Sequence, residues 1–280
     1  MIMFGRKALS LLRSTHPVPS FAVAIFAALF GIGVGLSSGR IVLVGVAVLL
    51  QQFSVGLSND WLDLKRDRAA GRTDKPAAQG SVSGASVRTS ALITGALGLL
   101  ISAWFGWETL IWMVLMLVVG WAYNLGLKST GFSIAPYAVG FGILPIFVTL
   151  AMEQSVIPPF WVILVAALLG VSAHFANTLP DLLEDRATGV RALPHILGQK
   201  VSALIIAGTA MLASSIVVSE SVNLAPITGL LGLLITILLA GVASLLALRP
   251  TPPRVIFPLL IMASFVNVLL LMLGVGSLVA

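Results

Sequence analysis

Residues 41–68 read IVLVGVAVLLQQFSVGLSNDWLDLKRDR, an apolar stretch that runs directly into a cluster of charges. Residues 41–58 contain no charged side chain, and a membrane helix needs about 20 predominantly apolar residues. Asp60, Asp63 and Asp67 follow, and at about 100° per residue these carboxylates fall within one narrow arc of a helix. Like charges on one face repel unless a cation neutralises them. The stretch therefore predicts a membrane helix that ends in a cation-dependent site.

The composition of the whole chain is that of an integral membrane protein. Of the 280 residues, 58% are apolar and only 9% are charged, whereas about a quarter of the residues of soluble domains are charged. We expect a single membrane domain that covers residues 1–280. The chain has no cysteine, which excludes disulfides and thiolate chemistry. Its net charge of +6 does not indicate nucleic acid, because basic residues in short loops beside apolar stretches set topology and meet anionic lipid.

Nine apolar segments have roughly the length that a bilayer requires. The sequence therefore predicts an all-α membrane protein, a bundle of about nine transmembrane helices. The segments are approximately residues 20–37, 41–58, 91–106, 109–125, 133–151, 159–176, 201–218, 226–247 and 255–278.

The distribution of basic residues predicts the orientation of this bundle. If the N-terminus lies inside, every one of the 16 lysines and arginines except Arg40 falls in an inner segment. Such a bias indicates a cytoplasmic N-terminus. It also places the acidic residues near Asp60 and Asp181 on the cytoplasmic side, and we expect a bacterial cytoplasmic membrane.

A second acidic cluster follows the sixth apolar segment. Its members share one arc if Pro180 leaves the stretch helical, and they are Asn177, Asp181, Glu184 and Asp185. Converging oxygen ligands favour hard cations such as Mg²⁺. Carboxylates for Mg²⁺ would come from Asp60, Asp63, Asp67, Asp181 and Asp185, and amide oxygens from Asn59 and Asn177.

Two metal-loaded faces are suited to hold a polyanion such as a diphosphate between them. Basic side chains would then bind the phosphate oxygens that the metal ions leave free. The best candidates are Arg72, Lys75 and Lys128, each near the cytoplasmic end of an apolar segment.

Three motifs carry a resemblance to a known family. Residues 59–68 and 71–76, NDWLDLKRDR and GRTDKP, resemble the first signature of the UbiA superfamily of intramembrane prenyltransferases. Residues 180–186, PDLLEDR, resemble its second signature, a D-x-x-x-D element, and residues 123–128, YNLGLK, resemble its Tyr/Lys element. The resemblance covers nearly the whole chain.

The resemblance implies nine helices around a central cavity that opens to the cytoplasm, in which two Asp-rich helices bind a prenyl diphosphate through Mg²⁺. The prenyl group would pass to an aromatic or other lipophilic acceptor, often a phenol or quinone precursor. The resemblance assigns to catalysis and metal binding the residues Asp60, Asp63, Asp67, Asp181 and Asp185. Substrate binding falls to Asn59, Arg72, Lys75, Tyr123, Asn124, Lys128 and Asn177. The start of the chain lacks the Arg-Pro pair common in aromatic prenyltransferases, which leaves the acceptor open.

Two other functions remain as alternatives. An enzyme of this kind could cyclise the prenyl chain without any acceptor. A transporter is less favoured, because the acids lie at the edge of the membrane and no apolar segment carries one in its interior. Tyr123 and Asn124 could simply lie at the membrane interface, and His174 could contact the acceptor or be an ordinary buried histidine.

Overall fold

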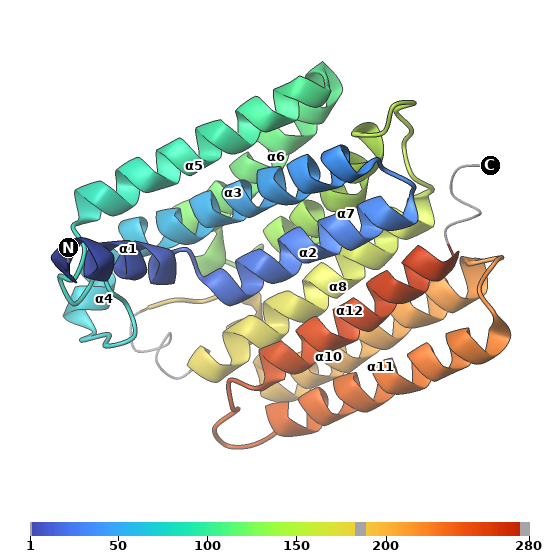
Figure 1. Ribbon diagram of the computed structural model, residues 1–280. Coiled ribbons are helices and arrows are strands. Elements are labelled where there is room, and N and C mark those ends of the chain that lie inside the picture. The colour runs from blue at the N-terminus through green and yellow to red at the C-terminus, as the bar shows by residue number, and fades with distance from the viewer. Residues whose placement is uncertain (1, 183–188, 275–280) are drawn as a thin grey trace.

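The computed structural model describes residues 2–182 and 189–274, and every regular element in those ranges is a helix. The long helices run alongside one another in a single bundle (Figure 1). They are α2 (Pro17–Gly33), α3 (Ser38–Leu62), α5 (Gly84–Phe105), α6 (Trp107–Leu125), α7 (Ala135–Leu150), α8 (Phe160–Thr178), α10 (Leu193–Glu220), α11 (Pro226–Ala247) and α12 (Ile256–Gly274).

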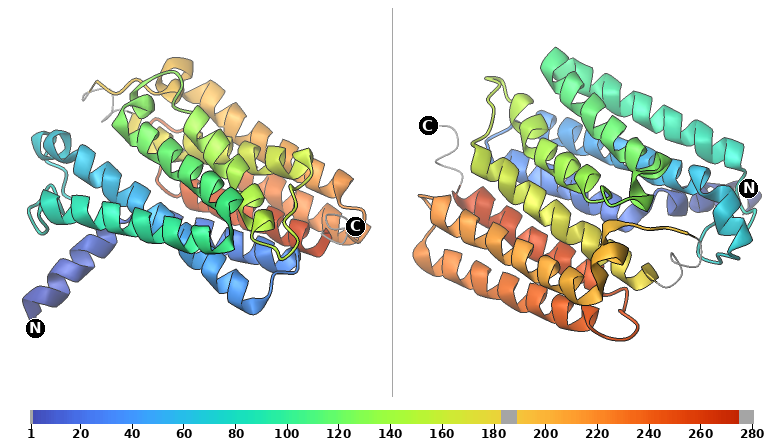
Figure 2. Two further views of the ribbon diagram at one scale, coloured as in Figure 1. Left: turned by 90° about the horizontal axis from the view of Figure 1, so that it is seen from above. Right: turned by 180° about the vertical axis from the view of Figure 1, so that it is seen from behind.

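Helices α3 and α8 have the most extensive packing within this bundle. Helix α3 packs against α5, α2 and α6, and α8 packs against α10, α7 and α12. Helices α5 and α11 lie at opposite edges (Figures 1 and 2). The short helix α4 (Leu64–Ala69) lies at the end of the bundle where α3 terminates (Figure 1).

The predicted all-helical membrane class is confirmed, and each of the nine apolar segments overlaps one of the long helices. Seven helices in the described ranges are long and apolar enough to cross a bilayer, and the bent pair α1–α2 would make an eighth. Helix α7 is apolar but has only 16 residues. Nine crossings and a cytoplasmic N-terminus therefore stay predictions.

An N-terminal helix, α1 (Ile2–Ser14), was not expected from the sequence. It meets α2 at an angle of 62°, because His16 adopts a left-handed backbone conformation (φ 51°) and Pro17 then begins α2. The turn rests on α3 at Gly56, where a Cβ atom would lie 2.4 Å from the carbonyl oxygen of Thr15. This close approach brings His16 beside the last turn of α3.

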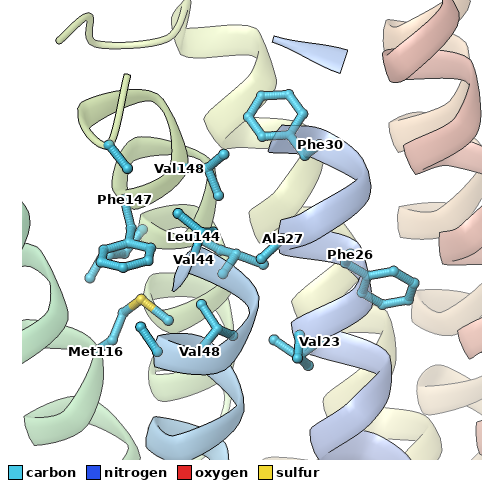
Figure 3. Close-up of a cluster of buried hydrophobic side chains, with 14 of the residues drawn as sticks. Val23, Phe26, Ala27, Phe30, Val44, Val48, Met116, Leu144, Phe147 and Val148 are labelled. Atoms are coloured by element: carbon cyan, nitrogen blue, oxygen red, sulfur yellow. The ribbon is translucent and has the colours of Figure 1, made fainter. Parts of the chain in front are cut away.

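A cluster of buried apolar side chains joins α2, α3, α6 and α7 (Figure 3). Val44 and Val48 of α3 contribute to it together with Phe147 of α7, and all three are fully buried. Arg40, the basic residue on the predicted outer side, donates a hydrogen bond of 2.6 Å to the carbonyl oxygen of Ala151. These contacts fix the first half of α3 and thereby the position of the acidic residues at its other end.

Candidate functional site

A cavity of about 520 Å³ lies among the helices and is lined by residues of α2, α3, α6, α7, α8 and α12. Its body is mainly apolar and includes Phe26, Met116 and Leu144. Polar side chains gather at one end, and among them are Asn59, Asp63, Arg66, Asp67, Arg72, Asp74, Lys75, Lys128, Asn177, Asp181 and Arg254. Such an amphipathic cavity suits a ligand with a polar head and an apolar tail.

The polar end is organised around Lys128 in the 3₁₀ turn η1 (Leu127–Ser129). The Lys128 Nζ donates to Asp63 Oδ2 at 2.5 Å and to Asn59 Oδ1 at 2.9 Å. Lys128 is 9% exposed, and burial lowers its pKa while the adjacent Asp63 carboxylate opposes that effect. Arg66 donates to the same oxygen of Asp63 at 2.8 Å. Asn59 and Lys128 thus meet at Asp63, and their role in substrate binding stays a prediction.

The three aspartates of the first acidic cluster do not share one face, and this part of the sequence interpretation was wrong. Helix α3 ends at Leu62, the chain bends at Asp63 (φ −82°, ψ −6°), and α4 begins at Leu64. Asp63 and Asp67 line the cavity, whereas Asp60 is not among the described residues that do so. The bend therefore separates Asp60 from the other two carboxylates.

Asp60 points instead toward the turn between α1 and α2. Its Oδ1 atom accepts a hydrogen bond from Lys75 Nζ at 2.5 Å and lies 3.0 Å from His16 Nε2. The side chain is almost fully buried, at 2% exposure, and its Oδ2 atom has no hydrogen-bond partner among the described residues. Asp60 thus anchors Lys75, which itself lines the cavity.

Asp67 and the loop after α4 form one side of the polar end. Burial raises the pKa of Asp67, and the neighbouring Asp63 carboxylate adds to this effect. Arg72 donates two hydrogen bonds of 2.8 Å to Asp74, from Nε to Oδ1 and from Nη2 to Oδ2. This bidentate contact is the main reason why the pKa of Asp74 falls to about 2. The loop therefore presents a fixed Arg72 at the cavity.

The second acidic cluster begins on the opposite side of the cavity. Helix α8 ends at Thr178, and Pro180 and Asp181 belong to the 3₁₀ turn η2 (Leu179–Asp181). Asn177 and Asp181 both line the cavity. Arg254, in the loop between α11 and α12, approaches Asp181 Oδ1 with its Nη2 at 3.4 Å. Asp185 and Glu184 lie outside the described residues.

Aromatic side chains cover the wall between the polar end and the apolar body. Tyr123 and Tyr137 line the cavity with their rings in an edge-to-face arrangement at 5.4 Å. Asn177 donates a hydrogen bond of 3.3 Å from Nδ2 to the Tyr137 hydroxyl. His174 lies behind Tyr137, fully buried, with Nε2 3.0 Å from Ser133 Oγ.

Asn124 differs from these residues because its amide group joins two helices. Its Nδ2 donates to the carbonyl oxygen of Val55 at 2.9 Å and to Ser58 Oγ at 2.8 Å. Although Asn124 borders the cavity, both of these bonds hold α6 against α3.

The donors at the polar end suit a hard divalent cation. Asp63, Asp67 and Asp181 offer carboxylate oxygens, and Asn59 and Asn177 offer amide oxygens. In the described part of the chain, no three side chains of His, Cys, Asp or Glu converge on one point. Mg²⁺ does not need such a group, because it is usually held by one or two carboxylates together with water and substrate phosphates.

Three residues of the site were not identified from the sequence. Asp74 lies within the quoted loop, so its place in the motif could have indicated its role. Arg254 looked like a basic residue that only sets topology, and Tyr137 had no distinguishing neighbour in the sequence. Arg254 contacts Asp181, and Tyr137 contacts Asn177. Both contacts join elements that are far apart in the chain, and the spacing of residues in the sequence does not reveal such contacts.

Comparisons with known proteins identify the family of the chain. The family model of the UbiA prenyltransferase family matches residues 20–262. A curated relative, the bacteriochlorophyll synthase 33 kDa chain of Cereibacter sphaeroides, is 33% identical over 228 residues, which cover 75% of this chain and 73% of the relative.

Solved structures share the fold at lower sequence identity. A UbiA homologue from Aeropyrum pernix K1 in its apo form has a TM-score of 0.75 at 17% identity, covering 91% of this chain and 98% of its own. A UbiA homologue from Archaeoglobus fulgidus bound to GPP and Mg²⁺ has a TM-score of 0.72 at 15% identity, covering 95% and 98%. With its helical membrane fold and a family match that spans most of its length, this chain belongs to the UbiA prenyltransferase family.

Proposed function

We propose that this enzyme transfers the prenyl group of a prenyl diphosphate to an aromatic or other lipophilic acceptor, with Mg²⁺ as its cofactor. The observation that carries the proposal is the meeting of Asn59, Asp63 and Lys128 at the polar end of a cavity whose body is apolar. The Archaeoglobus fulgidus homologue bound to GPP and Mg²⁺ supports the choice of substrate class.

The basic side chains of the polar end bind the diphosphate in this proposal. Lys128, Arg72 and Lys75 would donate charge-assisted hydrogen bonds to its oxygens. Asp63, Asp67 and Asp181 would hold Mg²⁺, with Asn59 and Asn177 as neutral oxygen donors, and Asp185 as a further predicted ligand. When bound, Mg²⁺ supplies Lewis-acid stabilisation of the negative charge on the departing diphosphate.

The reaction breaks the bond between the allylic carbon and the diphosphate oxygen, and the diphosphate leaves with the electron pair. The acceptor then forms a bond to that carbon and loses a proton. Tyr123 and Tyr137 stand where π faces would stabilise the developing carbocation. The apolar cavity wall keeps water away from it.

The acceptor class rests on the nature of the cavity and on the curated relative. An apolar cavity within a membrane bundle receives its second substrate from the lipid phase. The curated relative is a bacteriochlorophyll synthase, which favours transfer to an acceptor over cyclisation of the prenyl chain. Membrane lipid is therefore both the surroundings of the enzyme and the source of its acceptor.

Mass spectrometry of the products tests this proposal. Purified protein would be incubated with Mg²⁺, a series of prenyl diphosphates and a membrane extract. We expect a product whose mass equals that of an acceptor plus the prenyl group minus one proton. A hydrocarbon with the mass of the prenyl group minus one proton would indicate a cyclase, and unchanged prenyl diphosphate would contradict the proposal.

A further inference from the structure

Arg254 connects the two acidic loops across the polar end of the cavity. Its Nη2 lies 3.4 Å from Asp181 Oδ1, and its Nη1 lies 3.8 Å from Asp74 Oδ2. Both distances exceed the 2.7–2.9 Å of a strong charge-assisted hydrogen bond. By contrast, Arg72 holds the same Asp74 at 2.8 Å. The guanidinium of Arg254 is therefore shared loosely between two acids.

The backbone of Arg254 is nevertheless held in place. Pro252 and Pro253 precede it and fix their own φ angles, and the amide of Ile256 bonds to the carbonyl oxygen of Pro253 at 3.3 Å. The side chain is 66% exposed and lines the cavity. A firmly placed backbone that carries an exposed, loosely paired guanidinium at the cavity is well suited to contact a bound anion.

Two other acids of the polar end are also paired with basic side chains. Asp63 is bound by Lys128 and Arg66, and Asp74 by Arg72. A divalent cation that binds these carboxylates competes with their basic partners. A diphosphate, in turn, competes with these carboxylates for the same basic side chains.

We propose that Arg254 is a diphosphate-binding residue that exchanges partners: it neutralises Asp181 when the site is empty and turns to the diphosphate when a divalent cation takes its place at Asp181. This inference rests on the proposed function, because it assumes that the polar end binds a metal ion and a diphosphate together. Partner exchange makes the two ligands dependent on each other, since each releases groups that the other needs.

The proposal predicts effects of opposite sign for the neutral variant Arg254→Gln. Without the competing guanidinium, a divalent cation alone should bind more tightly. An exposed ion pair contributes at most about 1 kcal/mol, so the gain should be roughly two- to fivefold. Pyrophosphate in excess Mg²⁺ should bind about tenfold more weakly, because a charged hydrogen-bond donor is lost. A residue that only supports the fold would weaken both.

The full-length protein in detergent allows both measurements. Mn²⁺ alone would be followed by electron paramagnetic resonance, and radiolabelled inorganic pyrophosphate in excess Mg²⁺ by equilibrium dialysis. Arg249→Gln is the matched control, since Arg249 is exposed in the same loop and does not line the cavity in the described structure. Arg254→Lys should retain part of the pyrophosphate affinity, because the charge remains while the planar fork is lost.

Opposite shifts in Arg254→Gln, with wild-type values in Arg249→Gln, would support partner exchange. If the wild-type protein binds both ligands and Arg254→Gln binds both equally well, or both more weakly, this inference is overturned. The proposed function would then remain intact. If the wild-type protein binds no pyrophosphate in the presence of Mg²⁺, the proposed function fails, and this inference fails with it.

Discussion

At the scale of single residues, Lys128 is the most constrained charge of the site. It is buried, it comes from a short turn rather than a helix, and it contacts two side chains at the end of α3. The Asp63 carboxylate beside Lys128 favours the charged form of the lysine and opposes the effect of burial on its pKa. Because Lys128 also lines the cavity, its charge can bind an anion in addition to its contacts with Asn59 and Asp63.

Replacement of Lys128 should weaken the use of prenyl diphosphate. We expect Lys128→Ala to lower kcat/KM about 100-fold, equivalent to about 2.7 kcal/mol of lost charged hydrogen bonding. Lys128→Arg should retain part of the activity, because the charge persists in a different geometry. Steady-state kinetics with geranyl diphosphate measure both effects. Lys65→Ala, at an exposed site outside the cavity, is the control. Wild-type kinetics in Lys128→Ala would reduce Lys128 to a structural role.

Loss of the Asp60 carboxylate should lower the stability of the protein and leave its metal affinity unchanged. Asp60→Asn removes the negative charge that faces the largely buried side chain of Lys75 and leaves the lysine charge uncompensated, so it should cost about 3 kcal/mol of stability. We expect a lower unfolding temperature, measured by thermal denaturation in detergent, with Mn²⁺ affinity close to that of the wild type. A loss of Mn²⁺ binding without a loss of stability would instead make Asp60 a metal ligand.

At the scale of elements, the sequence predicted the helices well and their relative faces less well. The apolar segments alone placed the long helices, because a span is defined by its own composition. The arc of Asp60, Asp63 and Asp67 assumed a continuous helix, and the bend at Asp63 ended it. Helix α1 was missed because its charged residues made the segment resemble a loop beside a membrane span.

Close packing of α7 against α8 also positions the aromatic wall. A Cβ atom on Gly170 of α8 would lie 2.6 Å from the carbonyl oxygen of Tyr137. Gly170→Ala should therefore separate the helices at a cost of about 1–3 kcal/mol and lower the unfolding temperature. Gly208→Ala in α10 is the control, since nothing lies within 4 Å of its Cβ position. Equal stability of the two variants would show that this contact does not determine the helix spacing.

At the scale of the whole molecule, the bundle brings together groups that the sequence keeps far apart. Asp63, Asp181 and Arg254 come from three separate parts of the chain and meet at one end of the cavity. The motifs predicted the first two as members of one site, because each acidic cluster followed an apolar span. The contact between Arg254 and Asp181 depends on how α11 and α12 pack, and one sequence does not encode that in any local pattern.

The orientation of the bundle can be tested with single cysteines, because the chain has none of its own. Ser81 and Asn223 are exposed in loops at opposite ends of the predicted topology. In intact cells, a membrane-impermeant thiol reagent should label Asn223→Cys and not Ser81→Cys. Both should react after the cells are opened. Labelling of Ser81→Cys from outside would reverse the predicted orientation.

The binding of radiolabelled geranyl diphosphate to purified protein is the decisive measurement. We expect retention of the ligand in the presence of Mg²⁺, loss when EDTA removes the metal ion, and loss in Asp63→Ala at every Mg²⁺ concentration, with Lys65→Ala retaining the ligand. Retention that is equal with Mg²⁺ and with EDTA, or unchanged in Asp63→Ala, would contradict the claim that the polar end of this cavity holds a prenyl diphosphate through a metal ion.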